Sequence, residues 1–394
     1  MAILSLYTVS FRNLSSEKID TDAKDVFLIG ENGQGKSNFL EALYFCSYAS
    51  SFRGSRDGEM AKNGETDFSA IANIGLLNGE SVSGRHDHLF LQISVKVEKS
   101  KKTVMLDGKK ITDRKDLLDT IPLVVFCHED MEFVSGSQER RRWFFDQTQS
   151  LYDPVYLDDL RRYRHVLKTR NAVLREIKLG FAGSKNGGDY QKDRLKAAEL
   201  LDALDPQLVE YGLRLMEKRQ IAAERFSLVF GSLYREVAGI NGIYIHYEPS
   251  WKKSLTSEDI VKQLTERRSI DSAQAVTLSG PHRDKYIFVL KDSIPRRFSP
   301  LEDFSRNAST GQRRLLALLL RIAQARCFSD LTGKAPVLLL DDVLLELDGE
   351  KRRRFLSVMP GYEQAFFTFL PEEPYKNYVN SGTLVYNVKN GVIK

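Results

Sequence analysis

One loop constrains this chain more than any other feature, and it fits the pattern G-x-x-x-x-G-K-[ST]: Gly30-Glu31-Asn32-Gly33-Gln34-Gly35-Lys36-Ser37. It lies between the apolar run 26–29, which favours a buried strand, and residues 37–44, which favour a helix. In that context the glycines let backbone N–H groups converge on phosphate oxygens, Lys36 can reach the β- and γ-phosphates, and Ser37 can ligate Mg²⁺. We therefore predict a nucleotide site that comprises residues 30–37 and the adjoining Asn38.

A second acidic element lies far downstream, where the apolar run 336–340 ends in Asp341 and Asp342. Alone, this would describe a buried strand that ends at a solvated acidic turn. In a protein with a phosphate-binding loop, however, the first carboxylate is expected to hold Mg²⁺ and the second to orient the attacking water. We predict Ser37 and Asp341 as metal ligands, and Lys36 and Asp342 as catalytic residues.

A third segment, Ser309-Thr310-Gly311-Gln312, precedes the apolar run 315–320, and such a helix start can bind an anion. The order of these three elements resembles that of ATP-binding-cassette ATPases, in which the signature loop of one copy covers the γ-phosphate bound to another. The wide separation of Lys36 from Asp341 also resembles the split heads of SMC and Rad-type proteins. The resemblance implies that Ser309, Gly311 and Gln312 contact ATP held by a second copy.

The pattern between the two halves predicts an insertion. Residues 65–125 favour strands, with a hairpin at Asp107-Gly108, whereas residues 150–270 carry apolar side chains at helical spacing. Pro206 is expected at a helix start, and 180–188 form a glycine-rich break. We expect an α/β, ABC-type P-loop ATPase head with a mixed sheet, interrupted by a smaller helical arm domain. The expected boundaries are 1–125 and 271–394 for the head and 126–270 for the arm.

Composition narrows the class of protein. With 42% hydrophobic residues the chain can bury extensive cores, and its net charge of +5 permits contact with a polyanion without arguing for one. Three widely spaced cysteines favour neither disulfides nor a zinc site, and a reducing compartment fits best. We read no signal peptide and no stretch of eighteen apolar residues, so the expectation is a cytoplasmic protein without a membrane span.

Several segments together resemble the RecF family of bacterial recombination proteins. The matching segments run in order from residue 11 to 348 and are Phe11-Arg12-Asn13, the loop 30–38, Leu40–Leu43, Ile121–Phe126, Gly136–Asp146 with its three arginines 140–142, Gly280-Pro281-His282-Arg283-Asp284, Ala308–Arg313 and Leu338–Asp348. The chain departs from the family pattern at Leu344-Leu345, at Ser37 in place of a threonine, and in the glycine-rich segment 180–188.

The resemblance implies an ATP-dependent DNA-binding mediator of recombinational and gap repair. It implies ATP and Mg²⁺ as cofactors, Arg12 as a further nucleotide contact, and an ATP-dependent homodimer on duplex or gapped DNA without sequence preference. It also implies RecR as a partner, RecO and RecA as further candidate partners, and loading of RecA as the outcome. Because Asp342 is one methylene shorter than the glutamate usual in cassette ATPases, slow hydrolysis is expected.

Four basic clusters could contact DNA phosphates, although charge runs more often form a solvated face: Lys99-Lys101-Lys102, Arg140-Arg141-Arg142, Arg161-Arg162-Arg164 and Lys351-Arg352-Arg353-Arg354. His86 and His88 are expected in a solvated loop, and His282 in a structural hydrogen-bond network. Glu129-Asp130 lie near the place of the cassette Q-loop, but no glutamine can be assigned there.

Three other readings remain. A different SMC- or Rad-type ATPase would carry a much longer arm than residues 150–270 allow. A nucleotide-gated DNA-binding scaffold would bind ATP with negligible turnover. A transporter subunit is disfavoured because no coupling sequence is recognisable.

Overall fold

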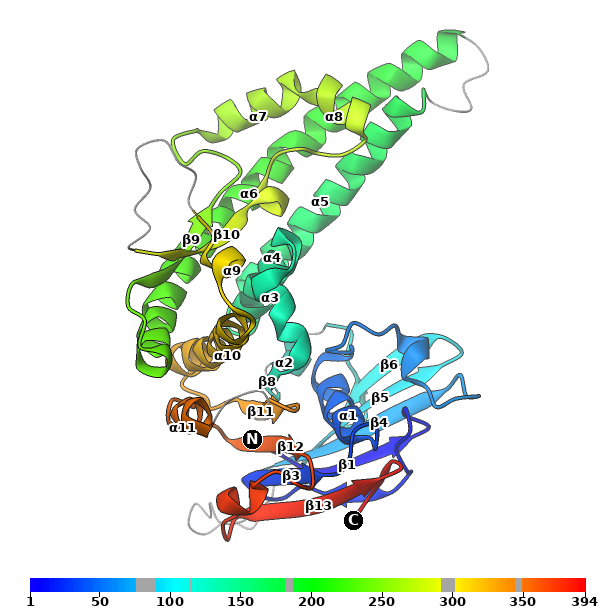
Figure 1. The fold of residues 1–394 in the computed structure, drawn as a ribbon. Coiled ribbons are helices and arrows are strands. Elements are labelled where there is room, and N and C mark those ends of the chain that lie inside the picture. The colour runs from blue at the N-terminus through cyan, green and yellow to red at the C-terminus, as the bar shows by residue number, and fades with distance from the viewer. Residues whose placement is uncertain (76–89, 114, 119, 181–186, 292–301, 344–348) are drawn as a thin grey trace. The chain divides into compact units, whose positions relative to one another are not determined.

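The computed structural model describes residues 1–75, 90–113, 115–118, 120–180, 187–291, 302–343 and 349–394 (Figure 1). The chain forms two compact units. The first comprises residues 1–131, 236–238 and 314–394, and the second comprises residues 132–235 and 239–313. Among the described helices, none is long and apolar enough to cross a membrane.

The first unit contains two six-stranded sheets with helix α1 (Lys36–Tyr48) packed against strands of both. One sheet is antiparallel in the order β2-β1-β4-β5-β6-β7, and its strands are Ala2–Val9 (β1), Lys18–Asp20 (β2), Phe68–Gly75 (β4), Leu91–Glu98 (β5), Lys101–Leu106 (β6) and Lys109–Lys110 (β7). Asp107 and Gly108 have φ angles of 50° and 73°, which suit the tight turn between β6 and β7. The predicted hairpin is confirmed.

The other sheet has the order β14-β13-β3-β12-β11-β8, and all its pairings are parallel except the terminal hairpin β13–β14. Its strands are Asp25–Ile29 (β3), Leu123–Phe126 (β8), Val337–Leu340 (β11), Gln364–Phe369 (β12), Thr383–Lys389 (β13) and Val392–Ile393 (β14). Every residue of β3, β8, β11 and β12 is buried, as expected for parallel strands covered on both faces.

The register of this sheet positions the predicted site. Ile29 pairs with Phe369, and Leu340 pairs with Phe367, so β3, β11 and β12 end at one edge. The loop after Ile29 and the carboxylates after Leu340 therefore lie at the same edge, although some 300 residues of chain separate them, since the Ser37–Asp341 spacing is 304. The other described helices of this unit are α2 (Lys115–Leu118), α11 (Gly349–Ser357), η1 (Asp57–Met60), η2 (His128–Asp130) and η4 (Tyr375–Tyr378), together with residues 314–332 of α10 (Thr310–Thr332) and the last residues, 236–238, of α6 (Gly187–Ala238).

The second unit is mainly helical. Its elements are α3 (Met131–Ser135), α4 (Gln138–Ser150), α5 (Pro154–Lys178), α6 (Gly187–Ala238), β9 (Ile243–Glu248), α7 (Ser257–Glu266), α8 (Arg268–Gln274), η3 (Pro281–Arg283), β10 (Lys285–Leu290), α9 (Phe304–Asn307) and the start of α10 (Thr310–Thr332). The long helices α5 and α6 share one apolar core that includes Tyr163, Leu174, Leu208 and Leu215. The expected helical arm is therefore present.

The unit boundaries differ from the sequence-based ones of 126 and 270, because residues 271–313 group with the helices. β10 pairs with β9 over six positions, and Asp271 accepts a hydrogen bond of 2.8 Å from Arg170 of α5. The sequence-based boundary at residue 270 therefore differs from the structure, in which residues 271–313 complete the second unit and the first unit resumes at residue 314.

The expectation that Pro206 marks a helix start is wrong, since this residue lies inside α6. Leu201 and Leu204 before it and Leu208 after it all point into the core, so one helix continues past the proline. Burial of this stripe outweighs the local cost of a missing N–H, which is about 3 kcal/mol in a helix interior.

Candidate nucleotide site

The phosphate-binding loop links β3 to α1 and depends on two glycines for its shape. A Cβ on Gly30 would lie 2.4 Å from the Val388 carbonyl oxygen, and one on Gly35 would lie 2.9 Å from Asn13 Oδ1. Gly35 precedes α1 with a φ of 118°, a conformation that L side chains rarely adopt. At Gly30 and at Gly35, therefore, the loop has no room for a side chain.

Lys36 is the first residue of α1, and only 3% of it is exposed. Its ammonium donates to the Gly30 carbonyl at 2.6 Å and to the Glu31 carbonyl at 3.3 Å, so it stays above the loop rather than in solvent. A buried cation held by carbonyl groups can exchange these partners for phosphate oxygens. Lys36 thus lies against the loop where we expect the phosphates to bind.

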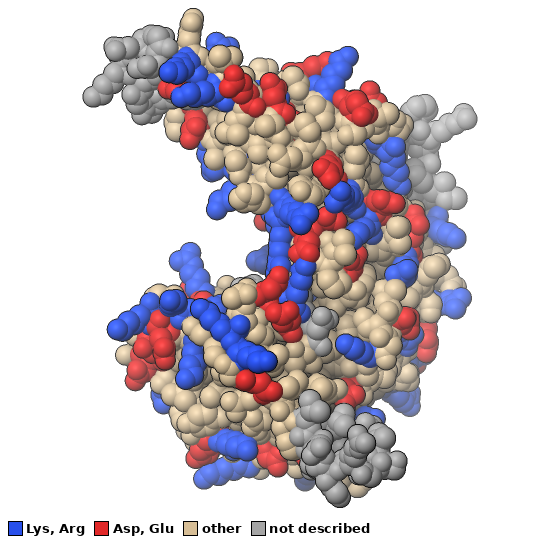
Figure 2. Space-filling view, turned by 180° about the vertical axis from the view of Figure 1, so that it is seen from behind, with Lys and Arg blue, Asp and Glu red and all other residues tan. Residues whose placement is uncertain are grey.

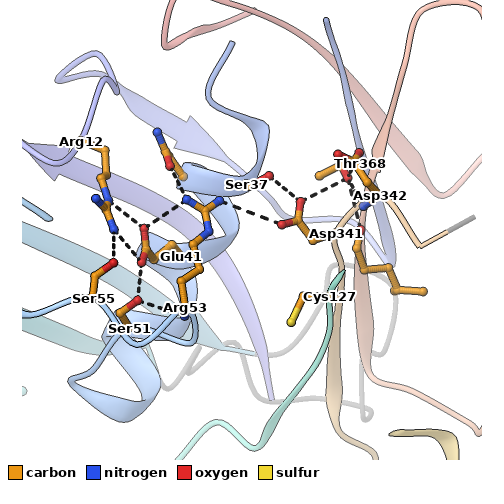
Figure 3. Close-up of polar contacts among 12 residues, drawn as sticks. Arg12, Ser37, Glu41, Ser51, Arg53, Ser55, Cys127, Asp341, Asp342 and Thr368 are labelled. Atoms are coloured by element: carbon orange, nitrogen blue, oxygen red, sulfur yellow. Dashed lines mark hydrogen bonds and ion pairs between the residues drawn. The ribbon is translucent and has the colours of Figure 1, made fainter. Parts of the chain in front are cut away.

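Ser37 and Asp341 meet at the shared edge of the sheet, and the Ser37 hydroxyl donates to Asp341 Oδ1 at 2.6 Å (Figure 3). Asp341 is held in place by its own N–H, which donates to the Phe126 carbonyl at 2.9 Å. Burial, aided by the nearby Asp342 and Glu129, raises the pKa of Asp341 to about 6 against the opposing effects of Ser37 and Arg53. A hydroxyl and a carboxylate at this separation are oxygen ligands of the kind that Mg²⁺ prefers.

Asp342 lies beside this pair in an uncommon backbone conformation, with a φ of 51°. Its N–H donates to Thr368 Oγ1 at 2.7 Å, and Thr368 Oγ1 donates to its carboxylate at 2.9 Å. The two predicted acidic residues are therefore adjacent but point to different hydroxyl partners. The neighbouring segment with Leu344, Leu345 and Asp348 lies outside the described residues.

Two arginines share the fully buried carboxylate of Glu41, on the second turn of α1 (Figure 3). Arg12 contacts it at 2.9 Å and also donates to Ser55 Oγ at 2.7 Å, so its guanidinium is committed to these groups. Arg53 lies 3.7 Å from Glu41 and extends to within 4.0 Å of Asp341. Of these two arginines, Arg53 therefore contacts the acidic pair, whereas Arg12, which we predict as a nucleotide contact, is held by Glu41 and Ser55.

A chain of side-chain amides continues from Arg53 to the phosphate-binding loop. Arg53 donates to Asn38 at 2.9 Å, Asn38 donates to Asn13 at 2.8 Å, and Asn13 donates to the Gln34 carbonyl at 3.2 Å. Gln34 also accepts backbone hydrogen bonds from Asn390 and Gly391 in the β13–β14 turn, at 2.7 and 2.8 Å. No sequence motif includes Arg53, because its contact with Asp341 forms only when the chain folds.

The three predicted signature residues lie in the second unit, at the start of α10. Ser309 and Gln312 form a reciprocal cap, in which Ser309 N donates to Gln312 Oε1 at 2.8 Å and Gln312 N donates to Ser309 Oγ at 3.2 Å. The start of α10 is therefore capped by its own side chains, and Ser309 and Gly311 there are exposed to solvent.

The four basic clusters do not form one uniform surface. Lys102 pairs with Asp57 at 2.7 Å, Arg141 is buried against Asp303, and Arg164 contacts Asp146 at 3.2 Å. Figure 2 shows Lys and Arg interspersed with Asp and Glu over the face seen there. Many of these charges are therefore engaged within the chain.

Two of the segments that carry the family resemblance meet in a buried cluster of the second unit. Arg219 of α6 contacts Asp146 and Asp284, each at 2.8 Å. His282 lies nearby, 2.7 Å from the Tyr163 hydroxyl and 2.9 Å from the Thr277 carbonyl. These contacts agree with the structural role expected for His282.

Of the two residues near the expected Q-loop position, Asp130 is structural. It is fully buried, and Arg321 donates to its carboxylate at 2.7 Å. Glu129 is exposed and acts on Asp341 through its charge. His86 and His88 lie outside the described residues.

Comparison with known proteins decides the family. Residues 2–394 match the family described as the RecF/RecN/SMC N terminal domain. The DNA replication and repair protein RecF of Treponema pallidum (strain Nichols) is 38% identical over 387 residues, which cover 97% of this chain and 98% of the relative. This chain belongs to the RecF family. The RecF protein of Halothermothrix orenii, 29% identical over 100% of this chain and 98% of its own, is a further relative of the same name.

Solved structures agree with this assignment. Two structures of the recombination mediator protein RecF in the RecFOR pathway, described with ATP and with ATPrS, have TM-scores of 0.80 and 0.79. They are 27% and 26% identical and cover 100% of this chain, and 98% and 97% of their own chains. An Smc head domain from Pyrococcus furiosus, 16% identical with a TM-score of 0.52, shares the fold. The predicted ABC-type head with a helical arm is confirmed.

Proposed function

We propose that this RecF-family chain binds ATP with Mg²⁺ and hydrolyses it slowly. Lys36 and the backbone of residues 30–35 would hold the phosphates, Ser37 and Asp341 would hold the metal, and Asp342 would orient the attacking water. Bound Mg²⁺ would offset the negative charge on the phosphate oxygens. The RecF structures described with ATP and ATPrS support this proposal.

The contact between Ser37 and Asp341 is the observation that carries the proposal. Two segments whose residues are 304 positions apart converge to 2.6 Å at the edge where the phosphate-binding loop begins. A structural turn would need no such pairing of a loop hydroxyl with a buried carboxylate. Lys36, buried beside the loop, supplies the matching positive charge.

Steady-state phosphate release from ATP tests the assignment. We expect slow, DNA-stimulated turnover in the wild type, and turnover reduced at least about 100-fold in Lys36→Met and Asp342→Asn, because each removes a group that acts on the transferring phosphate or the water. ATP binding should fall in Lys36→Met and persist in Asp342→Asn. Unchanged turnover in either variant would refute these roles.

We further propose that two copies close over the bound nucleotide, with Ser309, Gly311 and Gln312 of one copy against the γ-phosphate of the other. The exposure of Ser309 and Gly311 at the start of α10 supports this role, since the positive end of the helix dipole attracts anions. Arg12 remains a proposed nucleotide contact, although its side chain is engaged by Glu41.

The proposed setting is recombinational and gap repair in the cytoplasm. The relatives' name as DNA replication and repair proteins and the RecFOR pathway named for the solved structures support a role on DNA. We propose that the chain binds duplex or gapped DNA without sequence preference. RecR is the proposed partner, RecO is a further candidate partner, and RecA loading is the proposed outcome. A nucleotide-gated scaffold is the second candidate, and it would bind ATP tightly without the turnover measured above.

A further inference from the structure

Thr368 is a buried residue whose hydroxyl lies near both acidic residues of the site, Asp341 and Asp342. None of the sequence motifs includes it. It lies on β12, next to β11, and only 4% of it is exposed. Its Oγ1 is 2.7 Å from the Asp342 nitrogen and 2.9 Å from Asp342 Oδ1 (Figure 3). One hydroxyl therefore contacts both the backbone and the carboxylate of the same residue.

The hydroxyl has a single proton, and the distances decide where it goes. Thr368 Oγ1 lies 2.9 Å from Asp342 Oδ1 but 3.5 Å from Asp341 Oδ1 and from the Leu340 carbonyl. Asp341 Oδ1 already accepts from Ser37 at 2.6 Å. Since the Asp342 N–H is donated to Thr368, the proton of Thr368 is free for the Asp342 carboxylate. Each carboxylate thus has its own hydroxyl.

The hydrogen bonds between Thr368 and Asp342 hold Asp342 in an unusual backbone conformation. Its φ of 51° is in the left-handed region, where non-glycine residues are uncommon and persist only when their surroundings hold them. The N–H contact with Thr368 fixes that backbone, and the carboxylate contact fixes the side-chain rotamer. β12 also pairs in parallel with β11, so the hydroxyl is anchored on a rigid neighbouring strand.

We propose that Thr368 is the positioning residue that aims the Asp342 carboxylate at the attacking water. This inference rests on the proposed ATPase function. It adds Thr368 as the residue that sets the position of the Asp342 carboxylate. The hydroxyl is required rather than the methyl, because both contacts with Asp342 are made by the oxygen. Thr368 acts through Asp342 and needs no contact with the nucleotide.

Two substitutions separate the hydroxyl from the shape of the side chain. Thr368→Val keeps the shape and loses the hydroxyl, whereas Thr368→Ser keeps the hydroxyl and loses a methyl group. We expect Thr368→Val to lower kcat about 10- to 100-fold, as small misplacements of reacting groups do. The Kd for a fluorescent ATP analogue should stay within about twofold, because phosphate binding depends on other residues.

Thr368→Ser should restore kcat to within about threefold of the wild type, because the oxygen and its proton remain. Thr21→Val is the matched control: Thr21 is also fully buried in the first unit, and its hydroxyl donates to the Ile3 carbonyl at 2.6 Å. Its kcat should be unchanged, even if loss of the hydrogen bond lowers its melting temperature. Melting temperatures of all variants check that each protein folds.

A double substitution tests whether Thr368 acts through Asp342. In an Asp342→Asn background, Thr368→Val should have little further effect on the residual rate, because the two residues share one function. Full, independent loss in that background would overturn the proposal. So would a wild-type kcat in Thr368→Val, or a Thr368→Ser variant as slow as Thr368→Val.

The same measurements distinguish this proposal from the function beneath it. If the wild type hydrolyses ATP and Asp342→Asn does not, but Thr368→Val is unimpaired, the positioning role fails and the ATPase proposal stands. If the wild type binds ATP without hydrolysing it, the ATPase proposal fails, and the role of Thr368 fails with it.

Discussion

Glu41 is a buried residue that positions two arginines beside the candidate nucleotide site. Its carboxylate is fully buried, and its charge is balanced by Arg12 and Arg53. Burying a carboxylate without such partners would be costly, so both arginines are held close to α1. Arg53 alone of the two also extends toward Asp341, at 4.0 Å. Because it reaches the acidic pair, Arg53 is the better placed of the two arginines to contact phosphate.

We therefore expect Arg53→Met to raise the KM for ATP about tenfold, because a hydrogen bond to a charged group contributes about 1.5–3 kcal/mol. Steady-state kinetics at varied ATP concentration measure the change. Arg56→Met is the control, since Arg56 is an exposed arginine of the same loop. Equal KM values for the two variants would contradict a phosphate contact by Arg53.

His282 is a second residue whose surroundings fix its chemical state. The Thr277 carbonyl can only accept, so Nε2 carries a proton, and the Tyr163 hydroxyl donates to Nδ1. Burial, aided by Arg283 and other nearby arginines, lowers the pKa of His282 to about 4. The neutral ring is thus the form that the fold accommodates.

The lowered pKa predicts a loss of stability in acid. Between pH 6.5 and pH 4 the unfolded chain binds a proton at His282 that the folded chain does not, so the free energy of unfolding falls as the pH falls. The effect should reach about 2 kcal/mol, after some discount for partial solvent access. Urea unfolding of the wild type and His282→Asn at pH 7.5 and 5 measures it. A stability difference between the two proteins that does not change with pH would contradict this account.

At the scale of elements, the β13–β14 turn braces the phosphate-binding loop from the far end of the sequence. Gly391 N donates to the Gln34 carbonyl, and Ser15 N donates to the Gly391 carbonyl at 2.9 Å. Gly391 has a φ of 80°, and a Cβ there would lie 1.7 Å from the Asn13 carbonyl oxygen. Only glycine fits this contact, so the turn and the loop form one packed structure.

Gly391→Ala should therefore impair both stability and ATP binding. A left-handed conformation and overpacking each cost about 1–3 kcal/mol, so we expect a clearly lower melting temperature and weaker binding of an ATP analogue. Gly361→Ala is the control, because Gly361 has open space around it and no positive φ. Wild-type ATP affinity in Gly391→Ala would show that the turn does not shape the loop.

The elements also show what the sequence can and cannot predict. The strand, loop and helix around Lys36 follow from local periodicity and glycine placement, as does the hairpin at Asp107-Gly108. Arg53 and Thr368 could not be found this way, because their partners lie far along the chain and no fixed spacing marks them. The prediction for Pro206 was wrong because the preference of proline for the start of a helix was outweighed by burial of the apolar side chains of α6.

The chain as a whole consists of two compact units. The first contains the loop, the acidic pair and their supporting residues, and the second contains Ser309 at the start of α10. In the second unit, Asp146 and Asp284 from two family-typical segments converge on Arg219. The contacts of these two segments therefore stabilise the second unit. The proposed ATP site, by contrast, would be completed by Ser309 of a second copy of the chain.

Closure of two copies over ATP is the central claim, and sedimentation velocity tests it most directly. Wild type, Ser309→Arg and the control Ser257→Arg, an exposed serine at the start of α7, are each measured with and without ATP and Mg²⁺. We expect ATP to shift the wild type and the control from monomer toward dimer. Ser309→Arg should bind ATP and remain monomeric. A wild type whose sedimentation does not respond to ATP would contradict the claim.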